Sequence, residues 1–442
     1  MKAKKRMGWL ALCLACTTVM AACSNEKGGA EAPDTGGKTV VTLSVQQDSE
    51  FYRALEQKFE LAYPDIDLQV QAYKGIGEQL EAQDYEKFQK TAGTALLSGK
   101  GADIYETASL PVSEYVNQKL LLNMEDYLKQ TETLNKDDLA SNVLDALKLN
   151  GGTYIIPGGY YLRAFVGDGD ALKNVEFDDK TWTWQEFSAI AKSLIQAEEK
   201  AGAGRRYAIP DTPPDVLLQE MVVDSYNLFV DSTAQKAKFD SPAFKSMMQQ
   251  IKEMYDEQVM TSKPAEAGSQ LFYSAVLQKP ADFINIPYTL FKNPKLLHKP
   301  HNGTKGSMRI IPMTQYAIQA KTPVAAEAWK VIEYLLSEEA QSLPGREGFS
   351  LLRPVNQKQL SEVREQVKNG TYKLPDGQPA KVNDGDFAEF QEMMDTADNF
   401  AMLDGQMIAI VGGESLAFFS GQKTADEVAK LIQNKANTYL KE

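Results

Sequence analysis

The chain has 442 residues, a formal net charge of −13 at pH 7 and hydrophobic side chains at 43% of its positions. Such an acidic chain is a poor partner for nucleic acid and for anionic lipid headgroups, because all of them carry negative charge. Its length is ample for two domains that each bury a core. Composition therefore argues against a nucleic-acid-binding protein and favours a large folded body.

The first 22 residues have the layout of an export signal. A basic start is followed by an uncharged apolar run over residues 7–22, and the run stops at Cys23. A transmembrane helix is the alternative, but it would need about 20 apolar residues to cross a bilayer. This run has 16 residues. We therefore predict that residues 1–22 are a signal peptide.

Small residues precede the cysteine in the order Met20-Ala21-Ala22-Cys23. This pattern resembles the lipobox of bacterial lipoproteins. The resemblance implies cleavage before Cys23 and attachment of a diacylglycerol to its thiol, which would anchor the mature protein to a membrane. Cys13 and Cys16 are alternative cleavage sites, but they lie inside the apolar run. Because all three cysteines lie at or before position 23, the rest of the chain has no disulfide, cysteine metal site or cysteine nucleophile.

Residues 23–38 are predicted to be a flexible tether. After the cysteine this stretch is polar, contains four glycines and Pro33, and lacks large apolar residues. Such a composition cannot bury enough apolar surface to fold. Regular structure is expected to begin near Thr39.

The folded part is predicted to open with a strand, a helix and a second strand. Apolar residues alternate with polar ones over residues 41–45 and again over 66–72, which is the period of a half-buried strand. Between them, apolar residues recur at helical spacing, with Asp48 as the expected N-cap and Tyr63-Pro64 as the stop. The apolar residues of this helix are Phe51, Leu55, Phe59 and Ala62.

Predicted strands and helices continue to alternate along the chain. This alternation indicates an α/β fold with a mainly parallel sheet. The last helix begins with a capping box, Thr424-Ala425-Asp426-Glu427. The other expected helices cover residues 85–98, 184–197, 241–255 and 325–336, and the other expected strands cover 102–106 and 309–320.

Several short motifs are weak individually but specific in their order. They lie at residues 63–66, 101–104, 150–159, 183–187, 238–242, 326–329 and 337–341. In this order and spacing they resemble the bacterial extracellular solute-binding proteins of family 1, the group that includes maltose-binding protein.

The resemblance implies a periplasmic-binding-protein-like type II fold, in which two α/β lobes are joined by a hinge and the ligand lies in the cleft between them. It implies lobe 1 at residues 39–156, rejoined by about 309–343, and lobe 2 at 157–308, rejoined by about 344–442. Pro157-Gly158-Gly159 is the first hinge crossing in this interpretation, although on sequence alone it indicates only a tight turn. Independently, ligands of open α/β sheets bind beyond the carboxyl ends of strands.

Polar candidates for the ligand site follow two predicted strands. Gln46 and Gln47 lie just past the first predicted strand, and Glu106 and Thr107 lie just past a later one. Amide and charged groups at strand ends suit the hydroxyl groups of a sugar. Asp48 is expected to cap the following helix instead.

Sugar rings stack their C–H faces on flat apolar surfaces, so aromatic side chains are also candidates for the ligand site. The candidates lie next to the segments that are expected to cross between the lobes. Tyr160 and Tyr161 follow the first crossing, and Phe349 lies where the chain should recross the cleft. Packing in the core or hinge is the alternative for these three residues. Sugar-binding relatives often have a tryptophan in the second lobe, and Tyr288 is the candidate to take its place here. These relatives also have a Gly-x-x-Ala-Met stretch before that tryptophan. The chain lacks this stretch, which weakens the saccharide interpretation.

The sequence offers no catalytic or metal-binding motif. His298 and His301 are the two histidines, and Pro300 between them breaks the helical spacing that a shared metal would need. Glycoside hydrolysis needs a pair of carboxylates, and no pair stands out in so acidic a chain. We therefore expect no metal, no cofactor and no enzymatic activity, with an exported glycosidase as the alternative among enzymes.

The family resemblance and the lipobox together imply the receptor of an ABC importer. Such a receptor is lipid-anchored on the extracytoplasmic face of the cell membrane and captures a small solute, here expected to be a saccharide, by hinge closure. It then delivers the solute to the permease subunits, and we expect it to act as a monomer. The alternative is a surface sensor or scaffold lipoprotein that binds a ligand without import.

Overall fold

The computed structural model describes residues 37–202, 204–231, 234–302, 308–374, 376–401 and 404–441. The predicted signal peptide, Cys23 and the tether up to residue 36 lie outside the described residues. The chain from Lys38 to Glu442 forms one compact unit, separate from the unit that ends at Gly37. The described helices and strands all lie in the unit that begins at Lys38.

This unit opens with strands and helices in alternation. Their bounds are β1 (Thr39–Gln47), α1 (Glu50–Ala62), β2 (Ile66–Lys74), α2 (Ala82–Ser98) and β3 (Ile104–Glu106). β1 runs parallel to β2 and β3, with Leu43 level with Val70 in β2 and with Ile104 in β3. Because side chains alternate between the two faces of a strand, Val41, Leu43 and Val45 all point into the core. The predicted strand-helix-strand opening is confirmed.

The N-cap of α1 is Ser49, so the prediction of Asp48 as the cap is wrong. Ser49 has an extended backbone, and its side chain accepts a hydrogen bond from the N–H of Tyr52. Asp48 accepts a hydrogen bond from the N–H of Ser49 at 2.8 Å and forms an ion pair with Arg53. The helix begins one residue later than expected, which leaves the Asp48 carboxylate at the end of β1.

Two longer strands continue the sheet beyond β3. They are β4 (Ile156–Asp168) and β9 (Arg309–Ile318), and they are followed in space by β7 (Phe272–Leu277) and β8 (Pro294–Leu297). The strand order is β2-β1-β3-β9-β4-β7, with β8 also paired to β4, and all pairings from β3 to β8 are antiparallel. The prediction of a mainly parallel sheet is therefore wrong beyond β3. The reason is that β9 enters from the second lobe and runs against its neighbours.

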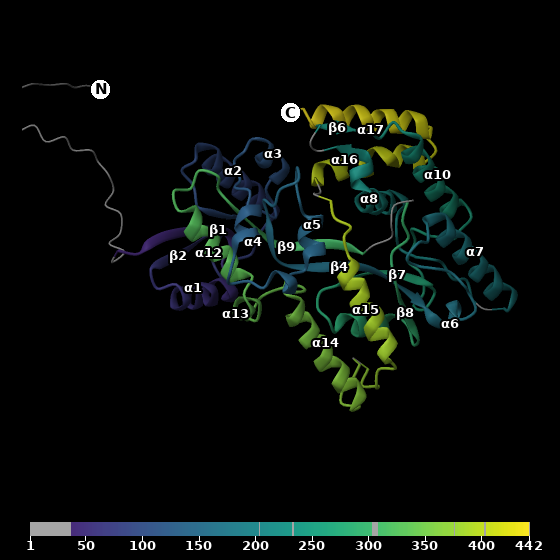
Figure 1. The fold of residues 1–442 in the computed structure, drawn as a ribbon. Coiled ribbons are helices and arrows are strands. Elements are labelled where there is room, and N and C mark those ends of the chain that lie inside the picture. The colour runs from purple at the N-terminus through teal and green to yellow at the C-terminus, as the bar shows by residue number, and fades with distance from the viewer. Residues whose placement is uncertain are drawn as a thin grey trace, which may run out of the picture. The chain divides into compact units, whose positions relative to one another are not determined.

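Short helices occupy the chain between β3 and β4. They are α3 (Val112–Asn117), α4 (Glu125–Gln130), a 3₁₀ turn at Lys136–Asp138, and α5 (Ser141–Ala146). In Figure 1, α1 lies below β1 and β2 and α2 lies above them.

The segment of the chain between β4 and β9 contains β7 and β8. Its further elements are α6 (Gly169–Leu172), α7 (Trp184–Lys200), α8 (Pro214–Asp224), α9 (Tyr226–Phe229), β5 (Val230–Asp231), β6 (Lys236–Ala237), α10 (Pro242–Asp256) and α11 (Asp282–Leu290). β5 and β6 form a separate antiparallel pair. The predicted helices at 184–197 and 241–255 are confirmed as α7 and α10.

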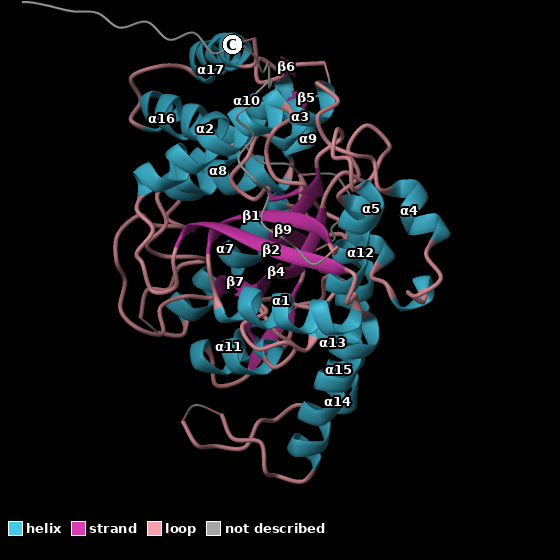
Figure 2. Cartoon of the chain, turned by 90° about the vertical axis from the view of Figure 1, so that its left-hand side faces the viewer, coloured by secondary structure: helices cyan, strands magenta, loops and turns pink. Residues whose placement is uncertain are grey.

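Six helices follow β9. They are α12 (Ala325–Leu335), α13 (Glu338–Gln341), α14 (Arg353–Lys368), α15 (Asp384–Thr396), α16 (Gly405–Phe419) and α17 (Ala425–Tyr439). α17 begins with the predicted capping box, in which Thr424 and Glu427 exchange side-chain to backbone hydrogen bonds. Helices lie on both sides of the sheet, so its strands form the middle layer (Figure 2).

Two apolar clusters form the core. The first contains buried residues of the strands β1, β2, β3, β4, β7 and β9 and of the helices α1, α2, α11, α12, α14 and α15. The second packs Phe165, Trp184 and Phe187 against helices α8, α10, α16 and α17, with ring centroids of Trp184 and Phe187 5.3 Å apart. β4 contributes side chains to both clusters, Val166 to the first and Phe165 to the second, so this strand connects the two parts of the core.

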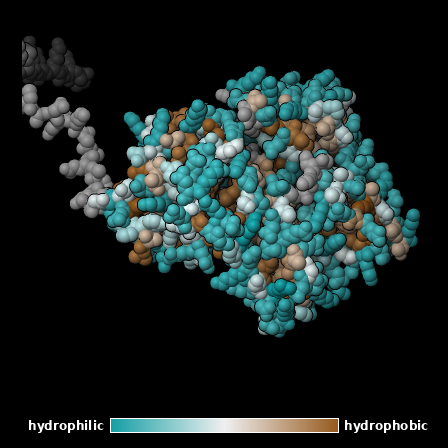
Figure 3. Space-filling view, viewed as in Figure 1, coloured by the Kyte–Doolittle hydropathy of each residue, from teal (hydrophilic) through white to brown (hydrophobic). Residues whose placement is uncertain are grey.

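The face of the molecule in Figure 3 is mostly hydrophilic, with small apolar areas scattered over it. No helix among the described residues is both long and apolar enough to span a membrane.

Candidate ligand-binding site

A cavity of about 260 Å³ opens where β1 and β3 end. These strands are parallel neighbours, so their carboxyl ends meet at one edge of the sheet, where α/β proteins bind ligands. The cavity is also walled by the crossing strands β4 and β9 and by the segment 345–347. The polar side chains in its wall include Gln46, Gln47, Asp48, Glu106, Arg346 and Glu347, and the aromatic ones are Phe51, Tyr52 and Tyr316.

Gln46 ties the two strand ends together. Its N–H donates to the Glu106 carboxylate at 2.9 Å, and its side-chain amide donates to the Ser109 hydroxyl at 2.5 Å. The neighbouring Gln47 amide donates to the carbonyl of Glu78. The sequence-predicted candidates Gln47 and Glu106 thus both lie in the cavity wall, and hydrogen bonds hold them in place.

Glu106 carries the most perturbed carboxyl group of the wall. Burial raises its pKa above the usual range, and hydrogen bonds from the Gln46 N–H and the Tyr52 side chain offset part of this rise. No charged side chain contributes to this shift. Because a carboxylate has about four lone-pair sites, accepting two hydrogen bonds leaves capacity for a ligand.

Tyr52 and Tyr316 close the buried end of the cavity. Their hydroxyl oxygens are 3.3 Å apart, and only 5% of Tyr52 and 0% of Tyr316 are exposed. Burial raises the pKa of both phenols, so they remain protonated hydrogen-bond donors. The Phe51 ring meets the Tyr52 ring edge-on, with centroids 5.5 Å apart. This corner of the cavity is therefore closed by packed aromatic rings.

Arg346 brings the guanidinium group into the wall. Its Nε donates to the carbonyl of Gln341 at 2.7 Å, and its Nη1 donates to the carbonyl of Glu347 at 3.1 Å. Burial lowers its pKa, and proximity to Tyr160 offsets this. Arg346 therefore braces the segment that returns from α13 past the cavity.

The start of β4 around Gly159, which is the first crossing, and the returning segment around Gly348 contact each other through their backbones. Tyr160 and Phe349 exchange hydrogen bonds, at 3.1 Å from the Tyr160 N–H and 2.7 Å from the Phe349 N–H. A Cβ added at Gly159 would lie 2.1 Å from the Glu347 carbonyl oxygen, and one at Gly348 would lie 2.7 Å from the Tyr160 carbonyl oxygen. The close approach therefore requires glycine in both segments.

Thr314 is strained where β9 passes the cavity. Its φ is +41°, a left-handed value that a β-branched residue rarely adopts. It lies across from Gly158, between the ladder pairs Pro157–Gln315 and Gly159–Met313. β9 thus departs from regular strand geometry beside the cavity.

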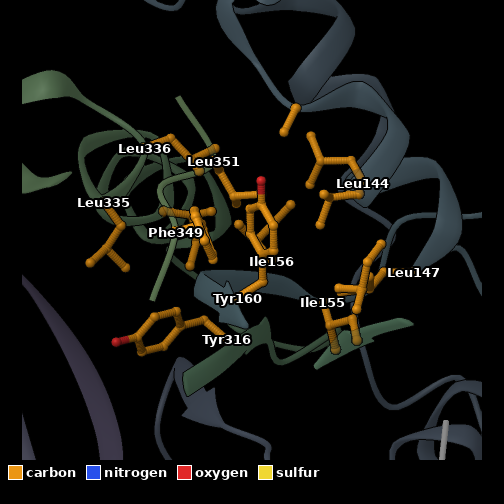
Figure 4. Close-up of a cluster of buried hydrophobic side chains, with 14 of the residues drawn as sticks. Leu144, Leu147, Ile155, Ile156, Tyr160, Tyr316, Leu335, Leu336, Phe349 and Leu351 are labelled. Atoms are coloured by element: carbon orange, nitrogen blue, oxygen red, sulfur yellow. The ribbon is translucent and has the colours of Figure 1, made fainter. Parts of the chain in front are cut away.

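Three predicted candidates are packed away from the cavity. Tyr160 is 2% exposed and Phe349 is 0% exposed, and their ring centroids lie 5.6 Å apart in the first core cluster. Figure 4 shows Tyr160 among Ile156, Phe349 and Leu351, with the Tyr316 ring pointing away from the cluster. Thr107 is also buried, and its hydroxyl donates to the carbonyl of Gln315 at 3.2 Å.

Tyr161 and Tyr288 are more exposed but do not line the cavity. Because Tyr161 points to the face of β4 opposite to Tyr160, its hydroxyl reaches the Glu347 carboxylate at 3.2 Å, next to the wall. The Tyr288 hydroxyl donates to the carbonyl of Lys381 at 2.7 Å.

Sequence reasoning missed Tyr52, Tyr316 and Arg346. Tyr52 lies in the first turn of α1, directly after a strand end, and this position is readable as a site signal in an α/β pattern. Tyr316 lies in the middle of β9 and Arg346 in a loop, and neither carries a local pattern that separates a lining residue from a packed one.

His298 has a structural partner instead of a metal. Its N–H and its Nδ1 both contact the Asp179 carboxylate, at 2.7 and 2.9 Å, in a buried position. Within the described part of the chain, no group of three or more His, Cys, Asp or Glu residues could hold a metal ion.

A two-lobed α/β fold, with a cavity at the strand ends beside the crossings between the lobes, defines the class of periplasmic-type binding proteins. The sequence profile described as bacterial extracellular solute-binding protein matches residues 44–342, which is more than half of the chain. The chain therefore belongs to this family, whose extracytoplasmic members bind small solutes and work with ABC permeases.

Solved structures with the same fold have low sequence identity to the chain. The extracellular solute-binding protein family 1 from Alicyclobacillus acidocaldarius is 17% identical with a TM-score of 0.59, and the match covers 92% of this chain and 100% of that one. The sugar-binding protein MalE from Xanthomonas citri is 15% identical with a TM-score of 0.62, covering 91% and 98%. The cyclic alpha-maltosyl-1,6-maltose binding protein from Arthrobacter globiformis is 13% identical with a TM-score of 0.58, covering 92% and 100%. No curated protein sequence matches the chain.

Proposed function

We propose that this protein is the receptor of an ABC importer and captures a saccharide in the cavity at the ends of β1 and β3. The observation that carries the proposal is the polar composition of the cavity wall, where Gln47 and Glu106 at the strand ends lie with Arg346 and Glu347. Amide, carboxylate and guanidinium groups bind sugar hydroxyls. The protein is proposed to act by binding alone, as a monomer.

Two of the neighbours in fold support the choice of ligand class. The Xanthomonas citri structure is described as a sugar-binding protein, and the Arthrobacter globiformis structure as a binding protein for cyclic alpha-maltosyl-1,6-maltose. At identities of 15% and 13% these structures establish the fold only, so the ligand class is carried to this chain by the cavity wall.

Ligand binding is proposed to close the two lobes. The wall described above comes from lobe 1 and from the crossing segments around Gly158, Thr314 and Arg346. A ligand that also contacts lobe 2 would favour the closed state, because only that state makes both sets of contacts. Small-angle scattering with and without saturating ligand should give a smaller radius of gyration for the complex. Superimposable curves would contradict closure.

The anchor is proposed to be a diacylglycerol on Cys23. A lipid anchor followed by a short tether confines the receptor near its permease and raises its effective concentration there. Cys23→Ala should release the protein from the membrane fraction, while the matched changes Cys13→Ala and Cys16→Ala should leave it bound. Membrane retention of Cys23→Ala would refute the anchor.

A thermal-shift screen tests the ligand class. The compact unit from Lys38 to Glu442 would be screened against mono- and oligosaccharides, polyols, amino acids and short peptides. A ligand at a hundredfold its dissociation constant stabilises its target by about 2.7 kcal/mol, which a melting curve detects. Stabilisation by saccharides is the expected result, and stabilisation only by another class would remove the saccharide assignment.

A further inference from the structure

The charges in the cavity wall do not balance. Asp48, Glu106 and Glu347 contribute carboxylates, and Arg346 is the cationic side chain among the described residues that line the cavity. The Asp48 carboxylate is already paired with Arg53, which lies outside the wall. The wall therefore presents two further carboxylates to a single guanidinium.

Arg346 is not a free partner for these carboxylates. Two of its N–H groups donate to the backbone carbonyls of Gln341 and Glu347, which fixes the planar guanidinium against the returning segment. The Glu347 carboxylate accepts a hydrogen bond from the Tyr161 hydroxyl at 3.2 Å. Neutral groups thus hold both side chains in place.

Glu106 lies deeper than either and has only neutral donors around it. The Gln46 N–H and the Tyr52 side chain supply its hydrogen bonds, and no ion pair to it is formed within the described ranges of the chain. Closure of the cleft would remove the remaining water from this carboxyl group. A charged group that loses its water without gaining a counter-ion is strongly disfavoured.

Aromatic rings stand beside the same carboxyl group. Phe51, Tyr52 and Tyr316 line the cavity with Glu106. These three side chains carry no positive charge, so they leave the charge of the Glu106 carboxylate unpaired. At longer range, the net charge of −13 raises the local concentration of cations and lowers that of anions.

We infer that the ligand of this cavity is an amino sugar, or an oligosaccharide that contains one, whose ammonium group pairs with Glu106. The inference deepens the proposed function and rests on it, because it names the class of saccharide for the same cavity. The ammonium supplies the counter-charge that Glu106 lacks, and its N–H groups occupy the free lone pairs of the carboxylate.

A charge series of sugars tests this assignment. Glucosamine, glucose and glucuronate share one ring and carry a positive, zero and negative charge, and β-1,4-linked glucosamine disaccharide and cellobiose extend the comparison to two rings. Calorimetric titration of the full chain at neutral pH should give the aminated member of each set an affinity at least about tenfold above its neutral counterpart. Equal affinities, or a preference for glucose, cellobiose or glucuronate, would overturn the amino-sugar assignment and leave the saccharide receptor standing. Absence of binding by every sugar would remove both proposals.

Two variants distinguish an ion pair between the ligand ammonium and Glu106 from a general effect of the protein's negative net charge. Glu106→Gln keeps the shape and removes the charge, so it should lower the affinity for the aminated sugar at least about tenfold more than the affinity for its neutral counterpart. Glu86→Gln, at an exposed position on α2 outside the cavity wall, makes the same change in net charge and should alter neither affinity. An equal loss for both sugars in Glu106→Gln would show a structural role and overturn the assignment.

Discussion

The cavity wall and the crossing segments are adjacent in space and follow different physical rules. In the wall, Gln47 and Glu106 end two strands and present polar groups that neutral donors satisfy only in part. In the crossings, Tyr160 and Phe349 are buried, and their backbones are joined by two hydrogen bonds across a glycine contact. The polar groups of the wall thus keep free hydrogen-bonding capacity for a ligand, whereas the side chains of the crossings are used in packing.

This difference shows which kind of sequence signal locates a site. A polar residue at the carboxyl end of a buried strand is placed by the end of the strand itself, so its position follows from the pattern. An aromatic residue after a hinge glycine can face either side of its strand, and the register decides which. On β4, Tyr160 faces the core and Tyr161 faces Glu347. The four predictions below would break or sharpen this contrast.

The largest effect is expected for Phe349→Ala. The ring is completely buried against Tyr160 and Phe390, and its removal leaves a cavity that costs about 3–5 kcal/mol of unfolding free energy. Urea denaturation measures this loss. Phe349→Leu keeps most of the volume and should cost less than about 1.5 kcal/mol. A loss below about 1 kcal/mol for the alanine variant would show that the crossing is not packed as described.

Gly159→Ala should be the next most damaging change. Its Cβ would lie 2.1 Å from the Glu347 carbonyl oxygen, so the two crossings must separate at a cost of about 1–3 kcal/mol. Gly413→Ala is the matched control, because this glycine is exposed in α16 with nothing within 4 Å of an added Cβ. The control should stabilise the protein by up to about 1 kcal/mol. Changes of the same sign in the two variants would contradict the close approach.

Glu106→Gln should change the pH dependence of stability in the ligand-free protein. Burial raises the pKa of Glu106 in the folded state, so the folded protein binds this proton more tightly than the unfolded chain does. The contribution of Glu106 to stability is full below its unfolded pKa and is lost as the pH rises through the folded pKa. The stability of Glu106→Gln relative to wild type should therefore increase from acid to neutral pH. Thermal melts at several pH values measure this difference, and a difference that is independent of pH would contradict the burial of the carboxyl group.

Thr314→Asn should have the smallest effect. Asparagine adopts left-handed φ values more readily than a β-branched residue, so it should relieve the strain at φ +41° and raise the unfolding free energy by about 0.5 kcal/mol. Thr322→Asn, outside the crossing, is a control in which the hydroxyl of a threonine is lost without relief of left-handed strain. Destabilisation by Thr314→Asn equal to that of the control would argue against strain at this position.

Much of the fold was predictable because periodicity and caps act locally. The β1-α1-β2 opening and the capping box at Thr424 follow from residues a few positions apart. The antiparallel half of the sheet was not predictable, because the direction of β9 depends on the path of the chain through the whole second lobe. The cap of α1 was misplaced by one residue, since Asp48 and Ser49 are both good N-caps, and Asp48 pairs instead with Arg53, five residues further along the chain.

The site was predictable only where strand ends determine it. Gln47 and Glu106 were placed in the wall by the ends of β1 and β3. Tyr316 and Arg346 enter the wall from β9 and from the returning segment, and their position depends on contacts between residues more than a hundred positions apart. Tyr288, which the family resemblance suggested, lies on α11 with its hydroxyl bonded to the Lys381 carbonyl, and its role in ligand binding stays a prediction.

Calorimetric titration of a stabilising saccharide against two variants tests the central claim most directly. The double variant Gln47→Ala with Glu106→Ala removes the strand-end polar groups, and Phe349→Leu alters only the packed crossing. We predict that the double variant loses about tenfold to a hundredfold or more in affinity, since each lost polar contact is worth about 1–3 kcal/mol, and that Phe349→Leu keeps the wild-type affinity. Wild-type affinity in the double variant would show that the ligand binds elsewhere.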